Sequence, residues 1–246
     1  ATGLGYSVTT VVGCIIFCNK KNLLHFTRPH FSFDVLKKAV SNGCSEMATA
    51  LVTGITTLMF NWTMLRYVGE NGIAAITIIM YVLMFVSSLF SGYSYGVAPM
   101  ISYYYGEQNH EKLKKLIRKS LKIIAVISVL SLAASLIITK PFVSIFSRPD
   151  NPVFDLAVTG NRICSIALLF IGFNIFSSGM FTALNNGIGS AILAFSRSFV
   201  FMVICLLALP LFFGVTGIWL ATPATELMAI ALACFMFLKY KNKYRF

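Results

Sequence analysis

The sequence predicts an all-α integral membrane protein, and three observations support this fold class. The chain has 246 residues, of which 57% are hydrophobic and only 11% are charged, whereas a soluble domain carries about 25% charged residues. Its apolar segments reach or exceed roughly 18 residues, the length that marks a membrane-spanning helix. These segments show no alternation of apolar and polar residues with period two, which argues against a membrane β-barrel.

Seven apolar segments account for the predicted helices. They cover residues 1–18, 39–65, 73–104, 120–139, 157–182, 190–213 and 217–238. The first segment is apolar from Ala1 onward and lacks the charged leader and cleavage site of a signal peptide. We therefore expect it to be the end of a helix in a longer protein. The other six segments form a predicted helical bundle at 39–238, with a linker at 19–38 and a basic tail at 239–246.

The connections between these segments follow from their length and from their turn residues. The short loop Val68–Gly72 predicts that the second and third segments are antiparallel neighbours. Pro99 predicts a bend or break that ends the third segment, and residues 106–119 follow as a polar, basic connection. Three prolines predict an irregular loop at 140–155, and Asn185-Asn186-Gly187 predicts a tight turn.

Gly92 and Gly96 form a GxxxG spacing within the third segment. This spacing usually allows two membrane helices to pack closely. Glycine is common in membrane helices, so the spacing predicts packing rather than function.

The net charge of +12 is distributed unevenly along the chain. Four of the 20 basic residues, namely Arg66, Lys140, Arg148 and Arg162, are expected on one side of the membrane. The other sixteen are expected on the opposite side: Lys20, Lys21, Arg28, Lys37, Lys38, Lys112, Lys114, Lys115, Arg118, Lys119, Lys122, Arg197, Lys239, Lys241, Lys243 and Arg245. An excess of Lys and Arg marks the cytoplasmic side. We therefore predict a multi-pass protein of the cell membrane with a cytoplasmic C-terminus and a cytoplasmic 19–38 linker. A nucleic-acid partner is disfavoured, because the basic runs flank membrane spans and lack interleaved aromatic residues.

Glu46 is the strongest candidate for a functional residue. It lies in the apolar run 39–65, and a carboxylate at bilayer depth costs roughly 2.5 kcal/mol or more unless it faces protein or water. The spacings between Asn42, Glu46, Thr49, Thr53 and Thr56 are those of one stripe along a helix. A membrane helix with such a polar stripe is typical of a cavity wall. The alternative is a structural acid paired with Arg197 or with a nearby serine.

Four other polar or charged residues fall inside the apolar segments. Arg197 lies a few residues into its segment, where it either reaches the cytoplasmic interface or balances an acid or lines a vestibule. Glu226 follows Pro223, which exposes backbone carbonyls and suits a cavity wall or a polar contact between helices. For Arg162 and Asn174 we favour hydrogen bonds between helices.

No motif for catalysis or nucleotide binding occurs in the chain. GxSxG, HExxH, Walker and dinucleotide-binding sequences are absent. A membrane-embedded enzyme would need convergent acids or histidines at membrane depth, and the two acids there occupy separate segments. The sequence therefore predicts neither an enzyme nor a cofactor. Transport, if it occurs, would draw its energy from an ion gradient.

Several motifs resemble the multidrug and toxic compound extrusion (MATE) family, in its MepA-like bacterial branch. The stretch SNGCSE at 41–46 resembles the start of the seventh helix of that family. GYSYGVAPMISYYYG at 92–106 resembles the end of its eighth helix, although Ala98 and Tyr104 replace the usual glutamine and asparagine. LAFSRS at 193–198 is similar to the region of its eleventh-helix arginine. LPLFFGVTGIWLATPATE at 209–226 resembles the last turn and the final helix of the family. Ala1–Tyr6 resembles the end of the family's sixth helix.

This resemblance implies the C-terminal part of a twelve-helix transporter, from the end of helix six at residues 1–18 through helix twelve. Members of the family have two six-helix bundles around a central cavity and alternate access between the two membrane faces. They export cationic, amphipathic drugs in exchange for Na⁺ or H⁺. The implied partners are these drugs, membrane lipid and the N-terminal six-helix bundle of the same protein. An acid in the family's seventh helix helps to bind the coupling cation, and Glu46 is the matching residue.

Our primary hypothesis is therefore a secondary antiporter in which Glu46, supported by Asn42 and Thr49, takes the coupling ion, with Na⁺ at Glu46 as the only expected metal. Aromatic side chains would hold flat cationic substrates by cation–π and apolar contact. The candidates for cavity or substrate contact are Thr53, Tyr81, Phe85, Tyr93, Asn174, Arg197 and Glu226.

The alternative is an exporter or flippase of lipid-linked saccharides from the same superfamily. Its cavity should need more cationic groups for phosphate-bearing lipid heads, and only Arg197 and Arg162 could serve. A purely structural membrane protein would leave the polar stripe unexplained.

Overall fold

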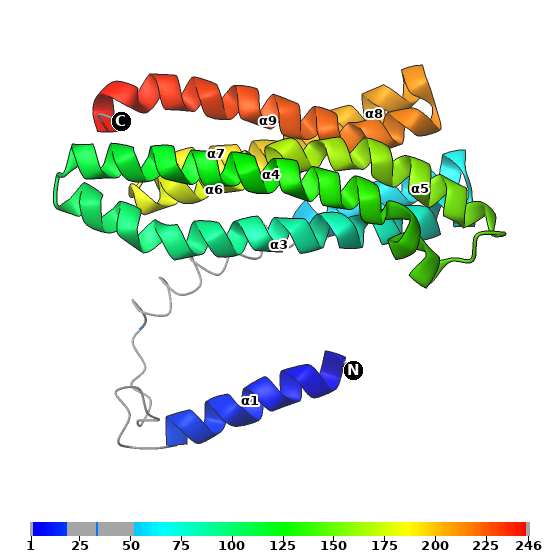
Figure 1. The fold of residues 1–246 in the computed structure, drawn as a ribbon, viewed down its shortest axis with the longest axis horizontal. Helices are drawn as coiled ribbons and strands as arrows, with labels where there is room; N and C mark the ends of the chain where they lie inside the picture. The colour runs from blue at the N-terminus through cyan, green and yellow to red at the C-terminus, as the bar shows by residue number, and fades with distance from the viewer. Residues whose placement is uncertain (1, 19–32, 34–51, 245–246) are drawn as a thin grey trace. The chain divides into compact units, whose positions relative to one another are not determined.

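The computed structural model describes residues 2–18, 33 and 52–244, and its chain divides into two compact units. The first unit, Ala1–Met47, contains helix α1 (Thr2–Cys18). The second unit, Ala48–Phe246, contains the helices α3 to α9 and carries all of the contacts discussed below (Figure 1). Because α1 has 17 residues and the helical segment 52–67 is described only from residue 52, the predicted spans at 1–18 and 39–65 remain predictions.

The second unit consists of long helices joined by short turns. After the helical segment 52–67 the chain forms α3 (Glu70–Gly106), α4 (His110–Phe146), α5 (Pro152–Cys164), the 3₁₀ turn η1 (Ser165–Ala167), α6 (Leu168–Ala183), α7 (Gly187–Phe195), the π-helical turn η2 (Ser196–Phe201), α8 (Met202–Phe213) and α9 (Val215–Tyr244). No strand is present among the described residues. The predicted all-α class is thus confirmed.

Five stretches of the described residues are long and apolar enough to cross a membrane. They are Glu70–Gly106, His110–Phe146, Pro152–Ala183, Gly187–Phe213 and Val215–Tyr240, and they confirm the last five of the seven predicted segments. Pro152–Ala183 is the most buried of them, because α6 packs against α3, α4, α7 and α9. α4 is the least buried. Its exposed face carries large apolar side chains such as Val129 and Ile137, as expected for a helix that faces lipid.

Glycines on α5 and α6 allow close contacts with α3. A Cβ on Gly172 would lie 2.5 Å from Phe90 Cε1 on α3, and one on Gly160 would lie 2.7 Å from Ile79 Cδ1 on the same helix. The predicted packing role of Gly92 and Gly96 is not seen, since no heavy atom of the described residues lies within 4 Å of a Cβ at either position. The structure therefore places the close approaches on the helices that face α3.

Three asparagines start helices after the turns. The side chain of Asn186 accepts a hydrogen bond from Gly189 N at 3.0 Å, and Asn109 and Asn151 cap α4 and α5 in the same way. Such caps satisfy backbone N–H groups that have no partner in the first turn of a helix. The tight turn predicted at 185–187 is confirmed, with Asn185 at φ 57°.

Two predictions about prolines were wrong. α3 continues through Pro99 to Gly106, and α4 continues through Pro141 to Phe146. Only residues 147–151 separate α4 from α5, which begins at Pro152, so the irregular loop is shorter than 140–155. Proline is tolerated inside membrane helices because neighbouring groups satisfy the freed backbone carbonyls. The basic residues after Gly106 lie on the first turns of α4 rather than in a long loop, because α4 begins at His110 after the Asn109 cap.

The turns expected on the cytoplasmic side meet at one end of the second unit. Figure 1 shows the α3–α4 turn, the α6–α7 turn and the C-terminus at the same end. The ring of Tyr244 lies 5.6 Å from that of Tyr105 and 6.5 Å from that of Phe181, which joins all three regions. The basic first turns of α4 are at this end too, so the arrangement agrees with the charge-based topology.

A buried polar network joins α4 to α5 and η1. Asn161 Nδ2 donates to Thr139 Oγ1 at 2.8 Å and to Ser135 Oγ at 3.2 Å, and the hydroxyls of Ser135 and Ser165 lie 2.7 Å apart. All four side chains are buried. Mutual hydrogen bonds offset much of the cost of burying these groups in an apolar surrounding, although Asn161 Oδ1 has no partner among the described residues.

Candidate functional site

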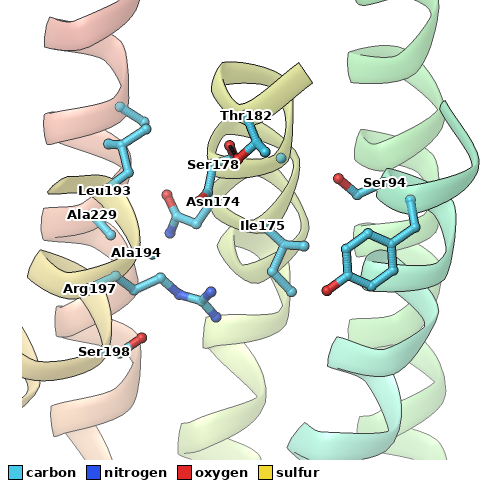
Figure 2. A pocket seen from close by; sticks show the side chains of 13 residues that line it. Ser94, Asn174, Ile175, Ser178, Thr182, Leu193, Ala194, Arg197, Ser198 and Ala229 are labelled. Carbon is cyan, nitrogen blue, oxygen red and sulfur yellow. Dashed lines mark hydrogen bonds between the residues drawn. The ribbon is translucent and has the colours of Figure 1, made fainter. Parts of the chain in front are cut away.

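A cavity, called the main cavity below, lies between α3, α6, α7, η2 and α9. It has a volume of about 260 Å³ and is partly open. Figure 2 shows the side chains that surround it. Its polar lining residues are Ser94, Tyr95, Asn174, Ser178, Thr182, Arg197 and Ser198. Because most of the lining residues come from the halves of their helices nearer to the α6–α7 turn, the cavity lies toward the end with the basic residues.

Arg197 occupies the π-helical turn η2, Ser196–Phe201. A π turn is rare, and it often occurs at functional sites because it displaces side chains and leaves backbone groups without their usual helical partners. Figure 2 shows the Arg197 side chain reaching from this turn toward α6. The side chain of Arg197 is 23% exposed, so its guanidinium group remains partly accessible from the cavity.

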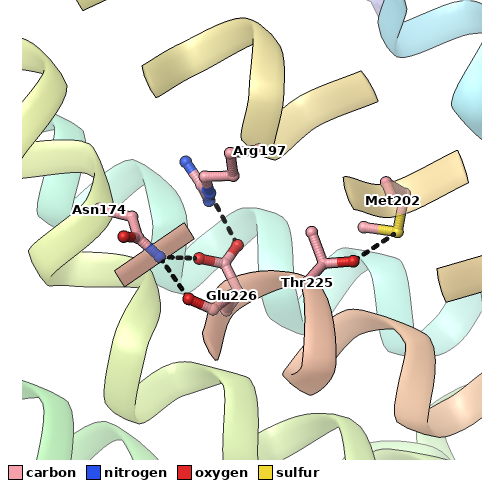
Figure 3. Close-up of polar contacts among 5 residues, drawn as sticks. All are labelled: Asn174, Arg197, Met202, Thr225 and Glu226. Atoms are coloured by element: carbon pink, nitrogen blue, oxygen red, sulfur yellow. Dashed lines mark hydrogen bonds and ion pairs between the residues drawn. The ribbon is translucent and has the colours of Figure 1, made fainter. Parts of the chain in front are cut away.

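Arg197 forms an ion pair with Glu226 of α9. Its Nε donates to Glu226 Oε1 at 2.8 Å, and Asn174 Nδ2 donates to the other carboxylate oxygen at 2.7 Å. Asn174 Nδ2 also donates to the backbone carbonyl of Glu226 at 2.9 Å, as Figure 3 shows. Three helical elements, η2, α6 and α9, thus meet at one carboxylate.

The pairing explains how a carboxylate is accommodated inside this bundle. The Glu226 side chain is only 5% exposed, and a buried charge is retained only when it is paired and hydrogen-bonded. Both of its carboxylate oxygens have a partner from another helix. Of the two alternatives for Arg197, the structure shows the one in which it balances an acid and lines a cavity. Asn174 makes the interhelical hydrogen bond that we favoured for it.

Hydroxyl groups from α6 and α7 form another part of the cavity wall. Thr182 Oγ1 donates to Ser190 Oγ at 2.7 Å, and Ser178 Oγ lies 3.0 Å from the same atom. These bonds fix α7 against α6 next to the turn at 184–186. The cavity is therefore bordered by neutral donors and acceptors, and no Asp or Glu is among its lining residues in the described part of the chain.

Thr56 connects the predicted polar stripe to η2. Its Oγ1 lies 3.2 Å from the backbone carbonyl of Ser198, and it also donates to Val52 O of its own helix at 2.8 Å. The stripe members Asn42, Glu46 and Thr49 lie outside the described residues, so their role stays a prediction.

The predicted aromatic contacts lie on α3, away from the main cavity lining. Tyr81 is half exposed, stacks with Phe146 at 6.3 Å between ring centroids, and lines a second cavity of about 190 Å³ against the segment 52–67. Phe85 is exposed, and Tyr93 packs partly buried against the core. None of the three lines the cavity at Arg197, and neither does Thr53, which is exposed.

Sequence reasoning missed most of the cavity hydroxyls and Tyr95. Ser94, Ser178, Thr182 and Ser198 look like ordinary small polar residues of membrane helices. Tyr95 lies within the GYSYG motif, which was the one available signal. Arg162, the other candidate cation, is exposed and does not line the cavity. No group of three or more His, Cys, Asp or Glu side chains that could hold a metal ion is found in the described part of the chain.

Comparison with known proteins agrees with this architecture. The family model MatE matches residues 47–207, well over half of the chain. The chain belongs to the MATE family. It is 25% identical over 244 residues to the multidrug export protein MepA of Staphylococcus haemolyticus, covering 98% of this chain and 53% of that protein. It is 26% identical over 206 residues to MepA of Staphylococcus aureus, covering 83% of this chain and 45% of that protein. The chain thus spans about half the length of the relatives that it matches.

Solved MATE structures share the fold of this chain. An inward-facing multidrug resistance MATE transporter gives a TM-score of 0.82 at 22% identity, with 98% of this chain and 56% of that chain covered. An outward-facing one gives 0.80 at 19% identity, with 98% and 54% covered. A MOP superfamily transporter from Pyrococcus furiosus, described as having a binding pocket of reverse polarity, gives 0.81 at 19% identity, with 97% and 55% covered. The protein is therefore a multi-pass membrane protein with a MATE-type transporter fold.

Proposed function

We propose that this chain is the C-terminal bundle of a secondary antiporter that exports cationic amphipathic compounds across the cell membrane in exchange for Na⁺ or H⁺. The MatE match over residues 47–207 carries the proposal. The relatives named as multidrug export proteins supply the activity, and they support a non-enzymatic role. In this proposal an N-terminal six-helix bundle of the same protein completes the substrate path, and membrane lipid surrounds both bundles.

The proposed coupling residue is Glu46, with Asn42 and Thr49 beside it. The spacing of the stripe predicts that these residues share a helix face with Thr56, whose hydroxyl contacts the η2 carbonyl next to Arg197. A charge change at Glu46 would therefore act on a helix that contacts the cavity wall directly. Binding of Na⁺ or H⁺ at that position would shift the population between conformations.

The proposed alternation is a rigid-body movement of the bundle. The fold matches an inward-facing and an outward-facing transporter chain almost equally, with TM-scores of 0.82 and 0.80. The interhelical contacts of Glu226 join η2, α6 and α9, and those of Asn161 join α4 and α5. Both observations support a bundle that moves as one body rather than one that rearranges internally.

The cationic part of a substrate is proposed to contact exposed aromatic rings of α3. Tyr81 and Phe85 are 50% and 67% exposed, and such rings attract a cation over their faces. The guanidinium of Arg197 makes the main cavity unsuitable for a second cation. The cationic and the polar contacts are therefore assigned to different surfaces.

Dye efflux from cells tests the proposal. Cells that express the full-length protein should expel a cationic dye, and the efflux should stop when the Na⁺ and H⁺ gradients are collapsed. Glu46→Gln should abolish efflux, whereas Glu70→Gln, an exposed acid at the start of α3, should leave it intact. Equal efflux with native protein and Glu46→Gln would make Glu46 a structural acid. No efflux from either, with both proteins present in the membrane, would favour the lipid-linked saccharide exporter.

A further inference from the structure

We infer that the cavity at Arg197 binds the carboxylate group of an amphipathic substrate. The inference rests on the proposed function only in treating this cavity as part of the substrate path. Its first support is the charge of the wall. Arg197 is the one charged side chain that lines the cavity among the described residues, while its partner Glu226 lies behind it.

The geometry of the ion pair leaves the end of the guanidinium for a ligand. Arg197 uses Nε to bind Glu226, and no hydrogen bond from either of its Nη atoms to another described residue is present. The two Nη groups form a planar fork that matches a carboxylate in a bidentate pair. Arg197 lines a partly open cavity, so a carboxylate that enters the cavity can accept both hydrogen bonds.

The surroundings of the fork fit a single negative charge. The hydroxyls of Ser94 and Ser198 line the same cavity and offer neutral donors to the second oxygen or to a neighbouring polar group, whereas those of Ser178 and Thr182 are engaged with Ser190. Arg197 and Glu226 together carry no net charge, so the charge of a ligand must be stabilised by hydrogen bonds from the guanidinium and the hydroxyls, and a doubly charged phosphate would cost more than a single carboxylate. The expected ligand is therefore a monoanionic carboxylate attached to an apolar body that fits a cavity of about 260 Å³.

Equilibrium binding to the purified full-length protein in lipid nanodiscs tests this inference. The probes share one ring system: 2-naphthoate, its neutral amide, and naphthyl-trimethylammonium. The carboxylate should bind about ten- to hundredfold more tightly than the amide, as expected for a hydrogen-bonded charged group. The trimethylammonium probe should not compete with it. Equal affinity for carboxylate and amide would overturn the inference.

Variants locate the binding at Arg197. Arg197→Gln combined with Glu226→Gln removes the guanidinium without leaving a buried charge, and it should abolish the preference for carboxylate. Glu226→Gln alone removes a countercharge 2.8 Å from the guanidinium, so it should strengthen carboxylate binding severalfold, an effect that misfolding cannot produce. Arg162→Gln, at an exposed arginine outside the cavity, is the matched control and should bind like native protein.

Two results would contradict the assignment. One is a carboxylate preference that persists in the double variant, since the anion would then bind elsewhere. The other is weaker rather than stronger binding in Glu226→Gln. Because no ion gradient is used, carboxylate binding to native protein and to Glu70→Gln, an exposed acid outside the cavity, is measured independently of export. Failure of binding and failure of export are thereby distinguished.

Discussion

Replacing Arg197 of the Arg197–Glu226 pair should destabilise the bundle more than replacing Glu226. Arg197→Gln leaves the Glu226 carboxylate, 5% exposed, with Asn174 as its remaining partner. Loss of one partner from a buried ion pair costs about 3–5 kcal/mol. Glu226→Gln leaves a guanidinium that is 23% exposed and can turn toward the cavity. Its amide oxygen can still accept one of the two hydrogen bonds, so we expect a cost of about 1–2 kcal/mol.

The double variant should be more stable than Arg197→Gln alone. Replacing both charges by neutral side chains of similar size is often neutral within about 1 kcal/mol. For a chain of this size, each kcal/mol lost from the free energy of unfolding lowers the melting temperature by roughly 2–4 °C. Arg197→Gln should therefore melt on the order of 10 °C lower than native protein, and the double variant within a few degrees of it.

Thermal and denaturant unfolding of the purified variants in one detergent measures this order. Native protein, the two single variants and the double variant form a complete cycle. The reasoning would be refuted if Glu226→Gln were as destabilising as Arg197→Gln. It would also fail if the double variant were less stable than Arg197→Gln, because the carboxylate would then not depend on the guanidinium.

Three further predictions concern contacts away from this pair. Gly172→Ala should lower the free energy of unfolding by about 1–3 kcal/mol, because the added methyl group overpacks the α3–α6 contact. Gly92→Ala is the control, since Gly92 has open space around it. Equal stability of the two variants in denaturant would contradict this packing. Asn161→Ala should cost about 1–3 kcal/mol because it leaves buried hydroxyls without a donor, and an unchanged melting temperature would argue against the network. Thr56→Val should slow dye efflux while changing the free energy of unfolding by less than about 1 kcal/mol. Thr57→Val is the control, because it loses only a hydrogen bond within its own helix. Equal efflux rates for the two variants would exclude the link between Thr56 and η2.

The helices could be predicted from the sequence because each depends on local composition. The last five apolar segments appear as helices of membrane length, and Asn186 starts α7 as its turn motif predicted. The errors at Pro99 and Pro141 have one cause. Proline stops a helix in water, but the surrounding helices of a bundle satisfy the carbonyls that it frees.

The sequence by itself determined the membrane class, the uneven distribution of basic residues and the motifs of the MATE family. It also marked Arg197, Asn174 and Glu226 as unusual, because charged and amide groups are costly in apolar segments. Which of them pair was decided only by the tertiary structure, since 29 residues separate Arg197 from Glu226 and 52 separate Asn174 from it. The same holds for the π turn and for the contact at Gly172: both depend on how helices distant in sequence pack together, and no local pattern records that packing.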